Sequence, residues 1–250
     1  MKIFSIFNKR SKSNRSRSKN QEDGYEGLIA SKELKSPATE AYRVLRTNIH
    51  YAATENQLRT LLFTSAGPSE GKSVTSANTA VVIAQSGKKV VLVDCDLRKP
   101  SQHRIWATDR AVGVTNVLVE NWPIDDVLIT TKVPNLSVVL SGPIPPNPAE
   151  LLGTAKYVKF IESLKERFDI VIIDAPPTIA VTDASVIASK VDGVVLVCNT
   201  ELARPEMAKK AKELLLNAKA NILGVVLNKM EVQGSDYYYY YYYGQSEKAG

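Results

Sequence analysis

Short apolar segments alternate with segments of helical periodicity along the chain from residue 58 onward. The apolar segments are continuous and rich in β-branched residues, which favours buried strands. They predict strands over Thr60–Thr64, Lys89–Asp94, Leu136–Leu140, Ile170–Asp174, Gly193–Cys198 and Ile222–Leu227. The periodic segments predict helices over Ser73–Ser86, Ala149–Arg167, Asp183–Lys190 and Pro205–Ala218. Buried strands that alternate with helices predict an α/β fold, in which a mostly parallel sheet carries helices on both faces.

A further helix is expected just before the first of these strands. Ser36 is a favourable N-cap, and Pro37 suits the first helical position. An apolar stripe at helical spacing follows, made of Tyr42, Leu45, Ile49 and Ala52. A charged stripe is made of Glu40, Arg43 and Arg46. At about 100° per residue it spans an arc of roughly 120°, so the charged side chains are expected to lie clear of the apolar stripe.

The first 24 residues differ in composition from the rest of the chain. They are rich in Ser, Asn, Lys and Arg and predict a disordered basic tail. This tail fits either a solubilising segment or weak binding to anionic lipid. Seven of the 32 Lys and Arg residues lie in residues 1–20, so the remaining 230 residues carry 25 basic and 26 acidic side chains. The body therefore lacks the positive charge that a nucleic-acid partner requires.

Residues 25–232 are expected to form one domain, followed by a flexible tail over residues 233–250. The tail is of low complexity and holds seven consecutive tyrosines. The apolar segments are too short to span a bilayer. The two distant cysteines, Cys95 and Cys198, predict neither a disulfide scaffold nor a zinc site. These features predict a cytoplasmic protein.

Residues 66–73 read Ala-Gly-Pro-Ser-Glu-Gly-Lys-Ser and match the phosphate-loop pattern, with Ala in a first position that is often Gly. The segment follows a predicted strand and opens a predicted helix, so backbone N–H groups are expected to face phosphates. Lys72 is expected to contact the β and γ phosphates of a nucleotide, and Ser73 to bind Mg²⁺. The expected nucleotide contacts are Gly67, Pro68, Ser69, Glu70, Gly71, Lys72, Ser73 and Val74.

Acidic residues follow two of the predicted strands. Asp174 ends one strand, at the sheet edge where open α/β sheets bind ligands. Asp94 ends another strand, and Asp96 is expected to point the same way. Acids at this place can hold metal or accept a proton from an attacking hydroxyl. The alternative is that Asp94 or Asp96 only caps a turn. The expected metal-binding residues are Ser73, Asp94 and Asp174, and the expected catalytic residues are Lys72, Asp94, Asp96 and Asp174.

The phosphate loop, the Asp94-Cys95-Asp96 segment and the Asp174-Ala-Pro-Pro segment together resemble the bacterial tyrosine kinases of polysaccharide export operons. These kinases are a branch of the deviant P-loop ATPases, which also include partition and division-site proteins. The resemblance covers about residues 31–243. Gly67 stands where partition ATPases usually carry an extra lysine. Residues 145–152 match the kinases' linker before the last large helix, and the motif Glu40-x-x-Arg43-x-x-Arg46 matches their oligomerisation motif.

The tyrosine run resembles the kinases' autophosphorylated C-terminal cluster, although family members usually interrupt their tyrosines with other residues. The resemblance implies an ATP- and Mg²⁺-dependent protein-tyrosine autokinase that modifies this cluster between subunits. The phosphorylation sites that it implies are Tyr237, Tyr238, Tyr239, Tyr240, Tyr241, Tyr242 and Tyr243.

The resemblance also implies partners and a cellular role. It implies a ring-shaped homo-oligomer, an activating membrane-embedded partner that controls polysaccharide chain length, and a cognate tyrosine phosphatase. The chain would be recruited to the inner face of the cell membrane by the membrane-embedded partner. It would regulate capsular or exopolysaccharide synthesis and export.

Several alternatives remain open at the level of sequence. By resemblance Asn228 contacts adenine, but a plain turn residue is an equally good interpretation. The tyrosine run is also compatible with an aromatic tail for protein contacts. The rival function is an ATP-dependent positioning switch without kinase activity, in which nucleotide drives dimerisation. Trp106 and Trp122 are interpreted as packing residues.

Overall fold

A sheet of eight strands runs through the described residues of this computed structural model, which are 2–7, 28–53, 58–108 and 112–230. The strands are β1 (Lys2–Phe7), β2 (Thr60–Ser65), β3 (Val90–Asp94), β4 (Leu128–Thr130), β5 (Leu136–Val139), β6 (Ile170–Asp174), β7 (Gly193–Asn199) and β8 (Ile222–Met230). The α-helices are α1 (Ile29–Lys32), α2 (Pro37–Ala52), α3 (Lys72–Ala84), α4 (Gln102–Ile105), α5 (Ile124–Val127), α6 (Pro148–Gly153), α7 (Ala155–Arg167), α8 (Asp183–Ala188) and α9 (Pro205–Asn217). A π-helical segment, η1, covers Asn116–Glu120.

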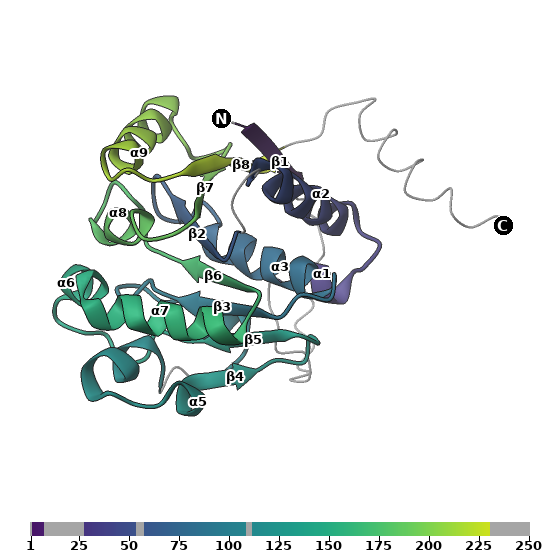
Figure 1. Cartoon of the computed structure of the whole chain (residues 1–250). Coiled ribbons are helices and arrows are strands. Elements are labelled where there is room, and N and C mark those ends of the chain that lie inside the picture. Colours follow the sequence, from purple (N-terminus) through teal and green to yellow (C-terminus); the bar gives the residue numbers. More distant parts are fainter. Residues whose placement is uncertain (1, 8–27, 54–57, 109–111, 231–250) are drawn as a thin grey trace, which may run out of the picture.

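The strand order is β1-β8-β7-β2-β6-β3-β5-β4. Every neighbouring pair is parallel except β4 with β5. The strand β2 lies between β7 and β6, so the loop that follows it leaves from the middle of the sheet (Figure 1). The six strands expected from the sequence are all present, and the α/β fold with a mostly parallel sheet is confirmed.

The first strand corrects the expectation of a disordered tail over residues 1–24. Residues 2–7 pair in parallel with β8 and extend the sheet at its edge. Overall composition argues for disorder, but these residues include Ile3, Phe4, Ile6 and Phe7, which favour an extended conformation beside an open sheet edge. The domain therefore includes a strand that lies before the expected boundary at residue 25. The rest of that tail, from residue 8, lies outside the described residues.

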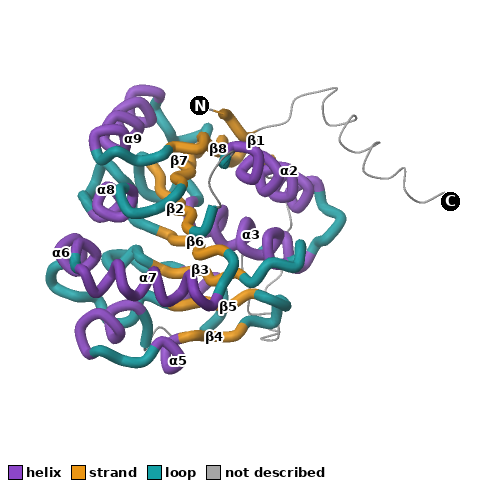
Figure 2. The backbone as a smooth tube through the Cα atoms, in the orientation of Figure 1, coloured by secondary structure: helices purple, strands orange, loops and turns teal. Residues whose placement is uncertain are grey.

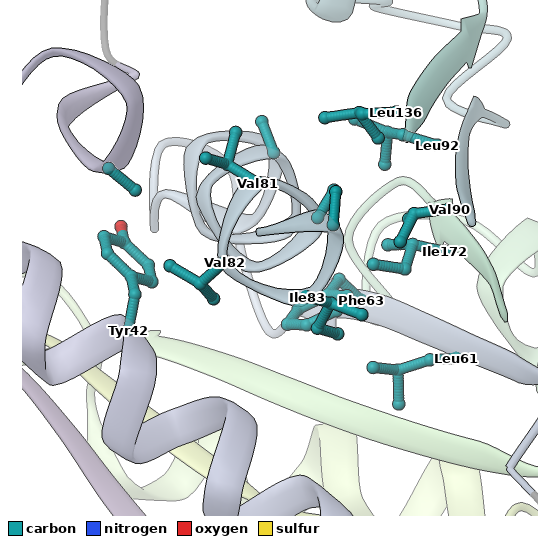
Figure 3. Packing of buried hydrophobic residues seen from close by; sticks show 14 of the residues in the cluster. Tyr42, Leu61, Phe63, Val81, Val82, Ile83, Val90, Leu92, Leu136 and Ile172 are labelled. Atoms are coloured by element: carbon teal, nitrogen blue, oxygen red, sulfur yellow. The ribbon is translucent and has the colours of Figure 1, made fainter. Parts of the chain in front are cut away.

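Helices cover both faces of the sheet (Figures 1 and 2). On one face α2 and α3 lie side by side, with α2 over β1 and β8 and α3 over the central strands, and Figure 3 shows Tyr42 of α2 reaching toward Val82 of α3. Leu61 and Phe63 of β2 join this cluster, whereas Leu62 joins a second cluster beneath α7, α8 and α9. Since side chains alternate along a strand, β2 is apolar on both faces, as expected for a central parallel strand.

The helix before the phosphate loop forms as the sequence predicts. The Ser36 hydroxyl accepts a hydrogen bond from Thr39 N at 3.1 Å, and Pro37 is the first helical residue. Tyr42, Leu45 and Ile49 are buried, with at most 4% of their surface exposed. Among the described residues, no helix combines the length and the apolar character needed to cross a membrane.

The segment Ala149–Arg167 departs from the single helix expected there. It forms the end of α6 and all of α7, because Thr154 is extended (φ −70°, ψ 157°) and caps the second helix through its hydroxyl. The strand β4 and the helices α1, α4 and α5 have no counterpart among the predicted elements, since three or four residues show no periodicity.

Candidate active site

The phosphate loop is held in an unusual backbone conformation between β2 and α3. Ser69 and Gly71 have positive φ values of 63° and 91°. At Gly71 a Cβ atom would lie 2.1 Å from Asn228 Nδ2, so only glycine fits there. Asn228 Nδ2 donates to the Glu70 carbonyl at 3.0 Å, and the Glu70 carboxylate accepts from Gly67 N at 2.7 Å. Burial raises the pKa of Glu70, against the effect of the backbone bonds that its carboxylate accepts.

Asn228 therefore contacts the phosphate loop through a hydrogen bond to its backbone. It is the last residue of β8 that pairs with β7, where its partner is Asn199, and it is buried. Its Oδ1 accepts from Lys229 N at 2.9 Å. From the sequence, Asn228 is interpreted either as an adenine contact or as a plain turn residue. Its hydrogen bond to the phosphate loop is a third role, which neither interpretation includes.

Lys72 points into a group of buried carboxylates. Its Nζ lies 2.8 Å from Asp96 Oδ2, 3.3 Å from Asp174 Oδ1 and 3.1 Å from Ser73 Oγ. Burial opposes the positive charge, but the carboxylates of Asp174 and Asp96 outweigh it and raise the pKa of Lys72. The ammonium stays charged at neutral pH and is positioned at the first turn of α3, where a phosphate would sit.

The ends of β3 and β6 bring two of the acids together. Asp94 and Asp174 are direct register partners on adjacent parallel strands, and both are buried. Asp94 Oδ1 accepts from Asp96 N at 3.1 Å, so the segment turns immediately after the strand. Burial, followed by the negative charge of Asp174, raises the pKa of Asp94 to about 8. The structure thus places Lys72, Ser73, Asp94, Asp96 and Asp174 in one cluster, as the sequence predicts.

The oxygen atoms around this cluster fit a magnesium ion. Carboxylates of Asp94 and Asp174 and the hydroxyl of Ser73 are hard ligands of the kind that Mg²⁺ prefers. Among the described residues no group of three or more acids, histidines or cysteines is arranged to hold a metal ion by itself. In phosphoryl-transfer sites Mg²⁺ is usually bound through one or two carboxylates together with phosphates of the substrate.

Two further contacts of the site are not predicted by any motif in the sequence. Gln102 N donates to Asp94 Oδ2 at 3.1 Å, and Gln102 Nε2 donates to Asp174 Oδ2 at 2.8 Å. Arg98 binds Asp183 at the start of α8 through two hydrogen bonds of 2.9 Å each. The only sequence signal is the place of Arg98 and Gln102 shortly after Asp96, in a segment without periodicity.

The predicted oligomerisation motif on α2 lies away from the cluster. Glu40 and Arg43 form an exposed ion pair of 3.0 Å on α2, while Arg46 Nη1 donates to the Val82 carbonyl at 2.9 Å, near the far end of α3. Val74 follows Ser73 on α3 and is exposed. Trp106 is buried, as expected for packing, whereas Trp122 is 38% exposed.

The expected phosphorylation sites all lie in the last part of the chain, after β8. The described residues end at residue 230, so the structure gives no position for these tyrosines relative to Lys72 and the acids. The sites outside the described residues are Tyr237, Tyr238, Tyr239, Tyr240, Tyr241, Tyr242 and Tyr243. Their modification therefore stays a prediction.

Comparisons with known proteins identify the family of the chain. A family described as an AAA domain matches residues 67–222. The tyrosine-protein kinase YwqD of Bacillus subtilis is 43% identical over 201 residues, which are 80% of this chain and 85% of YwqD. The kinase domain of the Escherichia coli tyrosine kinase ETK has a TM-score of 0.84 at 30% identity, over 93% of this chain and 92% of that domain. The chimerical protein CapA2B2 has a TM-score of 0.82 at 36% identity, over 92% of this chain and 94% of the chimera. Together with the phosphate loop and its acids, these similarities show that the chain belongs to the bacterial tyrosine-protein kinases, which are built on the P-loop NTPase fold.

Proposed function

We propose that this chain transfers the γ-phosphoryl group of ATP to tyrosine hydroxyls of the cluster Tyr237–Tyr243, from one copy of the chain to another. The observation that carries the proposal is the convergence of Lys72 and the three acids at the start of α3. A phosphate-binding lysine beside buried carboxylates combines the two needs of phosphoryl transfer, which are charge stabilisation and orientation of the acceptor.

Each group of site residues has a separate role in the proposed phosphoryl transfer. Backbone N–H groups of residues 69–73 bind the phosphates, and Lys72 leaves the carboxylates to stabilise charge on the transferring group. A carboxylate of the Asp94–Asp96 segment orients the tyrosine hydroxyl and accepts its proton. The new bond joins the phenolic oxygen to the γ-phosphorus, the bond to the β,γ-bridging oxygen breaks, and ADP leaves. Ser73, Asp94 and Asp174 would hold Mg²⁺, which supplies further charge neutralisation when bound.

The resemblance to the family supports a proposal for the wider function. We infer a homo-oligomer, with a ring as its form, and assign the motif of Glu40, Arg43 and Arg46 to the contact between copies. A membrane-embedded chain-length protein is the proposed activator, and it would recruit this cytoplasmic chain to the inner face of the cell membrane. A cognate tyrosine phosphatase would reverse the modification, and the cycle would regulate capsular or exopolysaccharide synthesis and export. No nucleic-acid partner is proposed, because the residues after the basic tail carry no net positive charge.

Intact mass measurement after incubation with Mg·ATP tests the proposal. The expected result is a series of added phosphate masses that map to Tyr237–Tyr243 after proteolysis. Incubation with Mg·ADP is the matched control and should add none. A nucleotide-driven positioning switch would hydrolyse ATP and change its assembly without any gain of mass, and this result would overturn the kinase proposal.

A further inference from the structure

Gln102 is the one residue whose backbone and side chain both bind acids of the candidate site in the described part of the chain. Its backbone N–H donates to Asp94 Oδ2 at 3.1 Å, and its Nε2 donates to Asp174 Oδ2 at 2.8 Å. Nε2 also lies 3.1 Å from the Ser73 carbonyl and 3.3 Å from Ser76 Oγ. The residue is completely buried. It therefore joins β3, β6 and α3 at the point where they converge.

The orientation of the Gln102 amide is fixed by Trp106. Trp106 Nε1 lies 3.0 Å from Gln102 Oε1. An indole N–H can only donate, so the amide atom that faces it must be the oxygen. The amide NH₂ group is consequently directed at Asp174, and a flipped amide would place two oxygens against each other there. The chemistry of the two partners therefore assigns the two ends of the amide.

The contacts leave defined faces of the two acids for a ligand. Asp174 Oδ2 is bound to Gln102, while Oδ1 faces Lys72 at 3.3 Å. Asp94 uses one oxygen for Asp96 N and the other for Gln102 N. Each of these oxygens can accept a second bond, so the contacts fix the orientation of both carboxylates and still leave lone pairs for a ligand. In metal sites such supporting hydrogen bonds orient the ligands and tune affinity.

We propose that Gln102 is a positioning residue that holds the carboxylates of Asp94 and Asp174 for the metal-bound nucleotide, and that Trp106 locks its amide in the required direction. The inference rests on the proposed function for its place in phosphoryl transfer, but its binding role does not require that any tyrosine is modified. Gln102 itself touches neither nucleotide nor acceptor in this scheme.

The test measures how strongly Mg²⁺ improves the affinity for ADP, as the ratio of Kd in EDTA to Kd in Mg²⁺, by titration calorimetry with the full chain. Gln102→Met keeps the side-chain length but removes the amide. Because loss of a supporting hydrogen bond lowers metal affinity by about 10- to 100-fold, the ratio should fall at least tenfold, with Kd in EDTA nearly unchanged. Trp106→Phe keeps an aromatic ring but removes the N–H, and should lower the ratio by a smaller factor.

A control variant and a measurement of thermal stability distinguish a positioning role of Gln102 from a packing role. Gln85→Met removes a glutamine amide that binds the Ala30 carbonyl at 3.1 Å, and should leave the ratio unchanged. A loss of thermal stability in Gln102→Met with an unchanged ratio would reduce the residue to a packing role and overturn the proposal. If Gln102→Met does not fold, Trp106→Phe decides, since an unchanged ratio there also overturns it. Wild-type chain that shows the Mg²⁺ effect but gains no phosphate mass would refute the kinase function alone.

Discussion

Lys72 Nζ lies 2.8 Å from Asp96 Oδ2, so the lysine of the phosphate loop is paired with a carboxylate of the neighbouring strand segment. Its second partner, Asp174 Oδ1, is 3.3 Å away and completely buried. The lysine thus neutralises acids when no phosphate is bound. When a nucleotide phosphate binds Lys72, the buried acids lose their positive partner and need another cation. Binding of phosphate and binding of a metal ion at this site are therefore coupled.

Replacement of Lys72 by Met should abolish tail phosphorylation, by at least about 100-fold, because charge stabilisation of the transferring group is lost. It should also destabilise the nucleotide-free chain by about 3 kcal/mol, since removal of one partner leaves buried carboxylates uncompensated. Mass measurement and thermal unfolding report the two effects, and added Mg²⁺ should recover part of the stability. Lys88→Met, at an exposed position just before β3, is the control. Wild-type phosphorylation in Lys72→Met would refute the assignment of the loop.

The raised pKa of Asp94 predicts that the nucleotide-free chain loses stability as the pH rises from the ordinary carboxyl pKa through about 8. Burial raises this pKa to about 8, above the ordinary value near 4, so the folded state holds a proton that the unfolded state has released. The stabilisation is complete below the unfolded pKa and disappears as pH rises through about 8. Between pH 7 and 9 the loss should be about 1 kcal/mol, or roughly 2–4 °C in melting temperature. Thermal scans in EDTA measure it, and Asp94→Asn should flatten the slope. An equal slope in that variant would show that other groups cause it.

Most of the fold and the centre of the site could be predicted because they depend on local patterns. Continuous β-branched segments identify the central strands, and their parallel order places Asp94 beside Asp174. Gln102 could not be found in this way, because its contacts join residues 8 and 72 positions apart in the chain. The motif on α2 likewise gives no sign that the Arg46 guanidinium donates a hydrogen bond to the Val82 carbonyl of α3 within the same chain. Composition does not predict β1 either, because this strand forms by pairing with the open edge of β8.

Two glycines with the same φ allow the cost of backbone strain to be measured apart from the cost of steric crowding in the phosphate loop. Gly71 and Gly87 both have φ of 91°, but a Cβ at Gly71 meets Asn228 Nδ2 at 2.1 Å, whereas none of the neighbouring atoms lies within 4 Å at Gly87. Gly87→Ala should therefore cost only the backbone strain, about 1–2 kcal/mol. Gly71→Ala should cost more and should weaken ADP binding, because the loop must move. Thermal unfolding and calorimetry compare them, and Asn228→Ala should partly rescue Gly71→Ala. Equal behaviour of the two glycine variants would contradict the crowding.

The two arginines of the charged stripe on α2 should have different effects. Arg46→Ala should lower stability by about 1 kcal/mol, since the Val82 carbonyl near the end of α3 loses its donor. The side chain of Arg43 is 36% exposed and pairs with Glu40, a surface ion pair of little value for folding. Arg43→Ala should therefore leave the melting temperature unchanged and reduce the assembly seen by light scattering. A large assembly that persists in Arg43→Ala would refute the contact between copies.

We predict that the active site of one copy phosphorylates the tyrosine tail of another copy. The tail follows β8, whose end lies beside the phosphate loop through Asn228, and an 18-residue segment at 233–250 is long enough to extend well beyond its own domain. We expect a neighbour's site to accept a neutral tyrosine hydroxyl, and to repel the tail once it is modified. Each phosphate adds about −1.5 to −2 charges, against the acids Asp94, Asp96 and Asp174 and against other modified tails.

The test of this transfer mixes two chains that are each unable to label themselves. One is a Lys72→Met chain that keeps its tail, and the other is an active chain whose seven tail tyrosines are Phe. Transfer between copies predicts phosphate on the inactive chain. If that chain stays unmodified although the two chains co-assemble and wild type labels well, transfer occurs within one copy. Light scattering of wild type before and after Mg·ATP tests the repulsion, which predicts smaller assemblies after full modification. An unchanged size would remove the proposed switch while leaving the kinase activity in place, because repulsion between modified tails acts only after the phosphoryl group has been transferred.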